Sequence, residues 1–203
     1  MMRSTAAAVT AVVLASLLAG CGKDRVAYSG FLNDYTNFRQ IEQNTLFYRD
    51  TGAELSRYDK FIIDPVIVHF APNAEGTAID PATLAEAVRY FEQVLKETLE
   101  EHGHEVVTTP GRDTIRIRTA ITDIKLTKGE WNILPQTKLL GIGLGGASME
   151  AEAIDTQTGR RVLAIVVTST GGALDAEGFG SLDDVKQVMR AWVDDLIKRL
   201  RAA

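Results

Sequence analysis

A single cysteine, Cys21, separates a short N-terminal segment from the rest of this chain of 203 residues. Ahead of it stand a basic residue near the start, an apolar run over 6–18, and the small pair Ala19 and Gly20. This order of positive start, short apolar run and small residues is typical of a secretory signal peptide. The run is shorter than the ~20 residues that cross a bilayer as a helix. We therefore expect residues 1–20 to be a signal peptide that takes no part in the fold.

The four residues Leu18-Ala19-Gly20-Cys21 resemble the lipobox of bacterial lipoproteins. The resemblance implies that the chain is cut before Cys21, whose thiol carries a diacylglycerol and whose new amine carries a further acyl chain such as palmitate. Three acyl chains exceed what stable membrane anchoring requires. The next residue is Gly22 rather than aspartate. By resemblance to Gram-negative sorting rules, that implies the outer membrane. The open alternative is an ordinary secretory signal followed by a free thiol.

Composition limits what the remaining chain can do. Without its first 20 residues it has 183, and the formal net charge changes from −5 to −6 because one arginine is removed. That length suits one domain with a sizeable core. A mildly acidic body argues against nucleic-acid binding and against adsorption to anionic lipids through charge alone. With Cys21 acylated there is no thiol for a disulfide, for catalysis or for a metal.

The predicted domain boundaries follow from the pattern of apolar residues. We expect a lipidated cysteine and short tether over 21–27, then a single globular periplasmic domain over 28–203. The six residues after Cys21 reach at most about 20 Å. The domain is therefore expected to lie close to its membrane.

The domain begins with a stretch, 28–57, that is rich in aromatic and aliphatic residues but lacks a clear period. We expect it to wrap the main fold as an irregular segment. Strands are predicted over 61–68, 105–108, 114–126, 147–154 and 161–170. Pro65 lacks an amide donor, so the first of these should lie at an edge or contain a bulge. The turn between the last two begins with Asp155 and ends with Gly159, which suits a tight hairpin.

Two helices are predicted. Asp80 and Pro81 supply an N-cap and a first-turn proline, and Gly103 suits the end of that helix. The second begins at Ser181 and runs toward the C-terminus. The sequence therefore predicts an α+β fold: an antiparallel-rich, mixed sheet of about five strands, with both helices packed on one face.

Glycines at 141, 143 and 146 match the spacing of a dinucleotide-binding loop. The following residues predict a strand rather than the required helix, so nucleotide binding is disfavoured. The alternatives are a flexible approach to the strand, or an apolar flap that contacts a partner or the membrane. The residues expected to make that contact are Trp131, Leu140, Ile142 and Leu144.

Three acidic residues stand close together, with Glu150 and Glu152 on one face of a strand and Asp155 just beyond. Paired carboxylates can perform acid–base chemistry or hold calcium. The favoured interpretation is instead a solvated strand face, on which Arg160 and Arg161 across the hairpin pair with the acids.

Other chemical candidates are weaker. His102 and His104 flank Gly103 at the predicted helix end, which indicates a turn rather than a metal site. No serine lies in a G-x-S-x-G setting. We therefore predict no catalytic residue, no metal and no cofactor.

Three stretches resemble a bacterial lipoprotein family known as domain of unknown function 3313. The most specific is Tyr28-Ser29-Gly30-Phe31-Leu32-Asn33-Asp34-Tyr35, and the others lie over 58–66 and 150–159. The resemblance covers most of the mature chain. It implies an exported lipoprotein and no established activity.

The leading hypothesis is a non-enzymatic lipoprotein anchored in the outer membrane, whose periplasmic domain binds another envelope protein or polymer or serves as a structural module. A small-molecule or lipid-binding domain is the alternative. A hydrolase of envelope polymer using Glu150, Glu152 or Asp155 is the third possibility.

Overall fold

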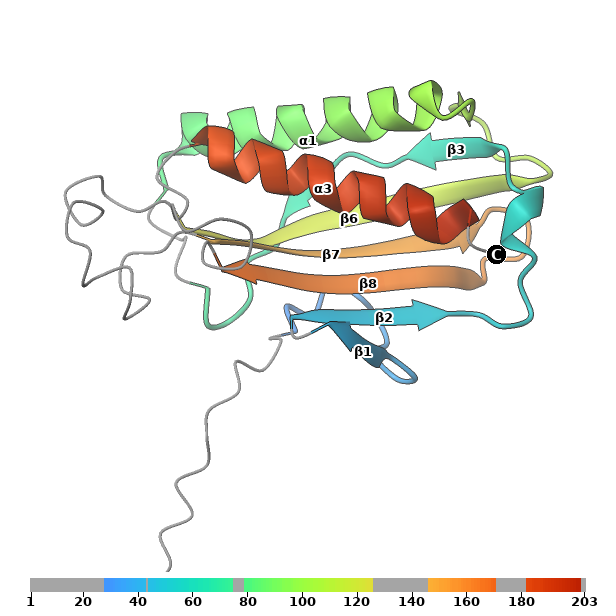
Figure 1. The fold of residues 1–203 in the computed structure, drawn as a ribbon, viewed down its shortest axis with the longest axis horizontal. Coiled ribbons are helices and arrows are strands. Elements are labelled where there is room, and N and C mark those ends of the chain that lie inside the picture. Colours follow the sequence, from blue (N-terminus) through green and yellow to red (C-terminus); the bar gives the residue numbers. More distant parts are fainter. Residues whose placement is uncertain (1–27, 43, 75–78, 126–145, 171–181, 202–203) are drawn as a thin grey trace, which may run out of the picture.

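The computed structural model describes residues 28–42, 44–74, 79–125, 146–170 and 182–201. It is built around an eight-stranded mixed sheet with two long helices on one face (Figure 1). The elements are β1 (Arg39–Glu42), β2 (Thr45–Arg49), the 3-10 turn η1 (Leu55–Arg57), β3 (Lys60–Ile63), β4 (Ile67–Val68), α1 (Pro81–Glu101), β5 (Glu105–Val106), β6 (Thr114–Lys125), β7 (Gly146–Asp155), β8 (Arg161–Thr170) and α3 (Leu182–Arg201).

The α+β class and the placement of both helices agree with the sequence analysis, but the expected five strands were too few. The sheet order is β1-β2-β8-β7-β6-β3-β5, and β4 pairs with β6 beyond β3. β1 and β2 lie in the stretch that was expected to be irregular. The sequence did not predict these strands, because Leu46 and Tyr48 pack on one face of the sheet while Phe47 packs on the other. A strand covered on both faces shows no apolar–polar alternation.

The remaining difference in strand count comes from Pro65. The predicted strand 61–68 is divided into β3 and β4, both parallel to β6. Lys60 pairs with Thr114 and Ile67 pairs with Ala120. The β3–β4 segment therefore takes seven residue steps where β6 takes six. The extra residue forms the predicted bulge at a position where proline cannot donate to the ladder.

Both helices lie where the sequence predicts, and α1 begins at its predicted cap, whereas the predicted N-cap of α3, Ser181, lies outside the described residues. The Asp80 carboxylate accepts hydrogen bonds from the backbone N–H groups of Ala82 and Thr83, and Gly103 has a φ of +82° just after α1. Phe91 of α1 and Trp192 of α3 are both buried, with ring centroids 6.1 Å apart. On α3, Val193 and Ile197 face the core as well, whereas Leu196 is only partly buried.

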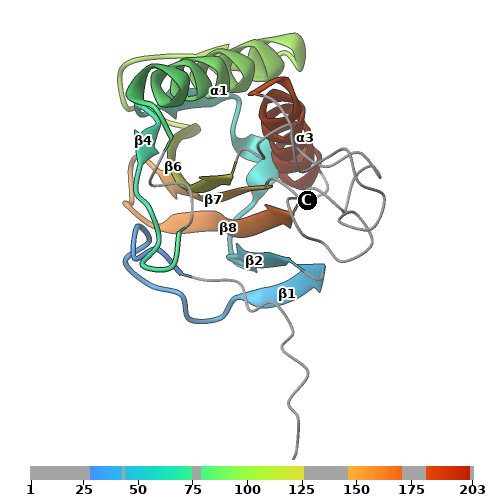
Figure 2. The same ribbon diagram turned by 90° about the vertical axis from the view of Figure 1, so that its left-hand side faces the viewer.

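The two faces of the sheet are covered differently (Figure 2). One face packs against α1 and α3 and forms the main core. The other is covered in part by residues 28–38, which we call the strap; the covered side of the sheet is the strap face. Phe31 and Leu32 of the strap pack with Ala120, Ala164 and Val166 of the sheet in a second apolar cluster. The strap is the part of the predicted wrapping segment that does wrap the fold.

No helix within the described residues is long and apolar enough to cross a membrane.

Candidate functional site

Six residues singled out in the sequence lie outside the described residues. They are Cys21, Gly22, Trp131, Leu140, Ile142 and Leu144. Their expected roles in lipid attachment, sorting and partner contact therefore stay predictions. The described part of the chain does contain the three acidic residues of β7.

These carboxylates were expected to lie on a solvated strand face, but all three are buried. The relative exposure of Glu150 is 0%, that of Glu152 is 7%, and that of Asp155 is 3%. A buried carboxylate is costly unless hydrogen bonds or opposite charges compensate it. Each of the three has such partners within the chain.

Glu150 is bound by the strap. Its Oε1 accepts a hydrogen bond from the Ser29 backbone N–H at 2.6 Å, and its Oε2 accepts from the Tyr35 hydroxyl at 2.6 Å and from the Leu32 N–H at 3.3 Å. The Tyr35 oxygen in turn accepts from the N–H groups of Gly30, at 2.9 Å, and Leu32. The N–H groups of Ser29 and Leu32 and the Tyr35 hydroxyl therefore surround the Glu150 carboxylate as hydrogen-bond donors.

Glu152 is held by two guanidinium groups. Arg118 donates a hydrogen bond to its Oε1, and Arg161 lies 4.0 Å from its Oε2. Arg118 also stacks over the Phe31 ring, with 5.1 Å between the guanidinium carbon and the ring centroid. Arg161 donates to the Asp34 carbonyl at 2.6 Å. Both arginines therefore join the buried acid to the strap.

Arg160, the other expected partner of these acids, pairs instead with Asp50 at 2.8 Å. Adjacent residues of an extended chain point to opposite sides, so Arg160 and its neighbour Arg161 have different partners.

Asp155 closes the β7–β8 hairpin and also binds the chain before β3. Its Oδ1 accepts from the N–H groups of Gln157 and Thr158, and its Oδ2 accepts from the Arg57 guanidinium at 2.6 Å and the Tyr58 hydroxyl at 2.7 Å. Burial raises the pKa of this carboxyl, but the hydrogen bonds from Tyr58 and the turn outweigh it and lower the pKa to about 2. Asp155 is therefore held as a carboxylate.

The two tyrosines that donate to these acids are held in their neutral form. Burial, then the hydrogen bond to Glu150 and its negative charge, raise the pKa of Tyr35 to about 12. Burial and the corresponding contact with Asp155 raise the pKa of Tyr58 to about 12.

The three stretches that resemble a known family contribute to the contacts of these carboxylates. The first contributes Tyr35 and the second contributes Tyr58, while the third carries Glu150 and Asp155. The sequence alone did not reveal this pairing, because Tyr35 and Glu150 are 115 positions apart. The available signal was the resemblance itself, since each of the three stretches contributes to at least one of two separate buried polar clusters: Glu150 and Glu152 lie on the strap face, whereas Asp155 and Tyr58 lie on the side of the main core.

In the described part of the chain, each of the three acids binds other segments of the chain. Within the described residues, the donors that hydrogen-bond to Glu150 are N–H and O–H groups of the strap. A substrate group would have to displace the strap to reach this acid.

The histidine pair takes the predicted turn. His102 is the C-cap residue of α1, and its Nδ1 lies 2.8 Å from the Thr98 carbonyl oxygen, whereas the His104 ring packs edge-on against Phe61. Within the described residues, no group of three or more His, Cys, Asp or Glu side chains is arranged to hold a metal ion.

The glycine-rich segment lies outside the described residues up to position 145. Gly146 begins β7, so the segment leads directly into a strand, as predicted. The helix that a dinucleotide-binding loop requires at this point is replaced by that strand.

Two openings differ in size and lining. An apolar cavity beneath the end of α3, next to Phe47 and Leu196, measures about 10 Å³, which is about the space of one water molecule. A groove of about 510 Å³ runs beside β5 and carries Lys60 and Arg112 among its lining residues. The rest of this lining is Val106, Val107, Thr108, Thr109, Gly111 and Thr114. The groove, which sequence reasoning missed, suits an anionic or polar group better than an acyl chain.

The fold resembles solved structures at low sequence identity. A PelC dodecamer from Paraburkholderia phytofirmans matches with 16% identity, 72% of this chain and 94% of that chain covered, and a TM-score of 0.42. A DUF4136 family protein from Bacteroides thetaiotaomicron matches with 9% identity, 79% and 97% covered, and a TM-score of 0.39. A DUF330 protein from Xanthomonas campestris matches with 12% identity, 71% and 86% covered, and a TM-score of 0.37.

Comparison with curated proteins gives no match. A family model, described as a protein of unknown function (DUF3313), matches residues 27–196. This match spans the strap, the whole sheet and most of α3, and thus every residue described above as binding the three buried carboxylates. The chain therefore belongs to the DUF3313 family.

Proposed function

We propose that this protein is a lipoprotein of the bacterial outer membrane, anchored through Cys21, whose domain is a non-enzymatic binding or structural module of the envelope. The observation that carries the proposal is the fastening of the strap to Glu150. A segment that begins seven residues after Cys21 is bound to a central strand of the sheet. Such an attachment suits a domain held in a defined position near a membrane.

The carboxylate network supports a structural role over a catalytic one. Glu150 and Glu152 bind the strap, Arg118 and Arg161, whereas Asp155 separately binds Arg57, Tyr58 and the β7–β8 turn. An acid in a hydrolase must be reachable by a water molecule and a substrate bond. The internal donors instead fill the positions that a substrate would need.

The anchor is tested by Cys21→Ala in the native host. We expect the variant to lose incorporation of labelled palmitate and to move from the membrane fraction to the soluble fraction. Ser16→Ala, within the apolar run, serves as the matched control and should stay in the membrane with its label. A Cys21→Ala protein that stays membrane-bound through washing would contradict the lipid anchor.

Sorting is tested separately by Gly22→Asp. We expect this variant to keep its label but to collect in the inner membrane, because the proposal assigns the sorting signal to that position. Unchanged outer-membrane localisation would leave the anchor intact and refute this part of the proposal.

The binding role is tested by crosslinking in intact cells, where we expect the wild type to be joined to a defined envelope protein or polymer. The opposing result is an activity: release of soluble fragments from purified envelope polymer by the wild type, but not by Glu152→Gln, would identify a hydrolase instead.

A further inference from the structure

Among the described residues, three large hydrophobic side chains are exposed: Tyr28 at 47%, Ile67 at 43% and Ile41 at 38%. Tyr28 and Ile67 both lie on the strap face, whereas Ile41 belongs to the edge strand β1. Exposed apolar groups gathered on one side of a protein mark a surface that meets another surface.

The direction of Ile67 follows from its pairing. Ile67 faces Ala120 across the parallel β4–β6 pair, and Ala120 packs against the strap residues Phe31 and Leu32. Paired residues of neighbouring strands point to the same side of a sheet. Two positions on, the His69 ring lies 6.4 Å from the Phe31 ring, which places this edge beside the strap.

Tyr28 stands where the described chain begins. Its ring lies 4.3 Å from that of Tyr35, which is fastened to Glu150, so Tyr28 is held on the strap face. Seven residue steps separate it from Cys21, and an extended chain covers at most about 25 Å in seven steps. A lipid on Cys21 therefore keeps Tyr28 within this distance of the bilayer.

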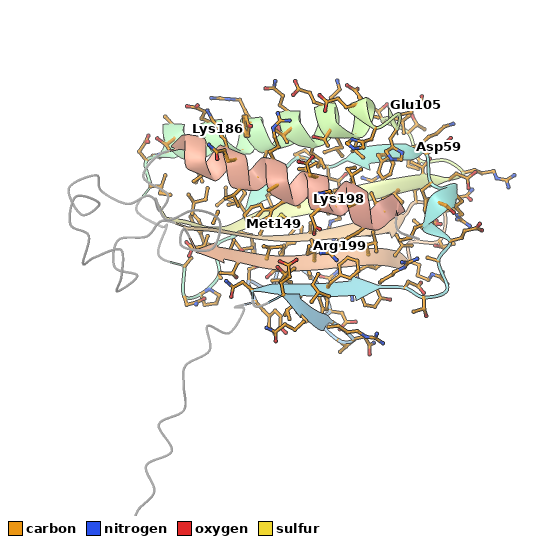
Figure 3. All side chains as sticks on the ribbon, viewed as in Figure 1. Asp59, Glu105, Met149, Lys186, Lys198 and Arg199 are labelled. Atoms are coloured by element: carbon orange, nitrogen blue, oxygen red, sulfur yellow. The ribbon has the colours of Figure 1, made fainter. Side chains whose placement is uncertain are left out.

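The strap face and the helix α1 differ in their charges. On the strap face the guanidinium groups have acidic partners: Arg116 with Asp64 at 2.7 Å, and Arg118 with Glu152. On the other side of the sheet, α1 carries five glutamates against one arginine and one lysine. The neighbouring α3 is not acidic, because its sequence contains five basic and four acidic residues, among them Lys186, Lys198 and Arg199 (Figure 3). Bacterial phospholipid surfaces that contain anionic lipids repel an acidic helix such as α1.

We propose that the strap face, around Tyr28 and Ile67, lies against the lipid bilayer, with α1 directed away from it. The inference rests on the proposed lipid anchor and adds an orientation to it. Tyrosine suits this position because its ring is apolar and its hydroxyl is polar, the combination that favours the membrane interface. The anchor brings this face to the membrane, and the two exposed side chains hold it there.

The experiment uses the full mature lipoprotein in vesicles of phosphatidylethanolamine and phosphatidylglycerol that contain a nitroxide-labelled lipid. Because Cys21 is the chain's only cysteine and its thiol would be acylated, one added cysteine gives a unique labelling site. An environment-sensitive fluorophore is placed through Asn33→Cys or Ile67→Cys on the strap side. Ala85→Cys, on the exposed surface of α1, is the matched control. We expect several-fold stronger quenching of the two strap-side labels than of the control.

A patch variant separates side-chain contact from mere proximity to the anchor. Tyr28→Ser with Ile67→Ser, probed at Asn33→Cys, should lose most of the quenching while circular dichroism shows an unchanged fold. Equal or stronger quenching at Ala85→Cys, or unchanged quenching in the patch variant, would overturn the proposed orientation. Mass spectrometry of the same samples distinguishes the two levels: an unacylated Cys21 refutes the anchor and the orientation with it, whereas an acylated protein with reversed quenching refutes the orientation alone.

Discussion

Glu150 is the residue on which the N-terminal part of the fold depends. It is fully buried, and among the described residues the groups that hydrogen-bond to it are two backbone N–H groups and a phenol. Hydrogen bonds to a charged acceptor are stronger than neutral ones, and several of them can compensate a buried carboxylate. The negative charge therefore organises the donors of the strap.

Glu150→Ala should destabilise the protein by about 2–4 kcal/mol, because it removes a charged acceptor and leaves buried donors unpaired. Urea unfolding followed by circular dichroism measures the change. Glu101→Ala, at the exposed end of α1, is the control and should stay within about 0.5 kcal/mol of the wild type. A similar small effect at Glu150 would mean that the strap contributes little to stability.

The strap is an element without regular secondary structure of its own over most of its length, and it keeps its place through contacts with the sheet. Its residues Phe31 and Leu32 bury apolar surface against the sheet, while Ser29 and Tyr35 donate hydrogen bonds to Glu150. Arg118 connects the two kinds of contact, because it stacks on Phe31 and binds Glu152.

Hydrogen–deuterium exchange should show the strap as one cooperative unit. We expect the amides of Ser29 and Leu32 to be protected in the wild type and to exchange much faster in Glu150→Gln, since the amide of glutamine cannot accept at both positions. Protection of β7 and β8 should change little, because the main-chain ladder between them does not involve the strap. Loss of protection across both strands together would show that the strap and sheet unfold as one unit.

At the scale of the whole molecule, the buried polar contacts on both faces of the sheet link stability to pH at both extremes. Asp155 has a folded-state pKa of about 2 against an ordinary value of 3.8. A depressed carboxyl pKa means that its contribution to stability is present above the ordinary value and is lost as the pH falls from about 4 toward 2.

Asp155→Asn should therefore lower the free energy of unfolding by about 1–3 kcal/mol at neutral pH, where the charged acceptor is lost. The difference from the wild type should shrink as the pH falls through this window. Urea titrations at several pH values measure it. A difference that stays constant between neutral pH and pH about 2 would exclude the ionisation of Asp155 as its source.

At alkaline pH the two tyrosines have the opposite effect, because their contribution to stability is lost as the pH rises. Tyr35 and Tyr58 have pKa values of about 12 in the fold, against an ordinary value of 10.0. The folded state favours the neutral phenol, so this contribution is full below pH 10 and is lost as the pH rises through about 12.

Spectroscopic titration of phenolate absorbance should show two tyrosines ionising near pH 12 in the wild type and one in Tyr35→Phe. Tyr48→Phe is the control and should leave both late ionisations in place. A wild type whose tyrosines all ionise near pH 10 would contradict the hydrogen bonds to Glu150 and Asp155.

Local chemistry was enough to predict much of this fold. The helices α1 and α3 repeat their apolar residues at the helical period, and Asp80 and Gly103 mark the limits of α1. The β7–β8 hairpin follows from Asp155 and Gly159, whose backbone φ is +68°. The bulge at Pro65 follows from the missing amide. Each of these depends on residues that are neighbours in the sequence.

The sequence by itself determined the α+β class, both helices, the hairpin, and membership of a family through three separated stretches. Only the tertiary structure decided that β1 and β2 extend the sheet, and that the acids of β7 are buried rather than solvated. The physical reason is distance along the chain. Whether a carboxylate on a strand faces water depends on what covers it, and the Ser29 amide that binds Glu150 lies 121 positions away.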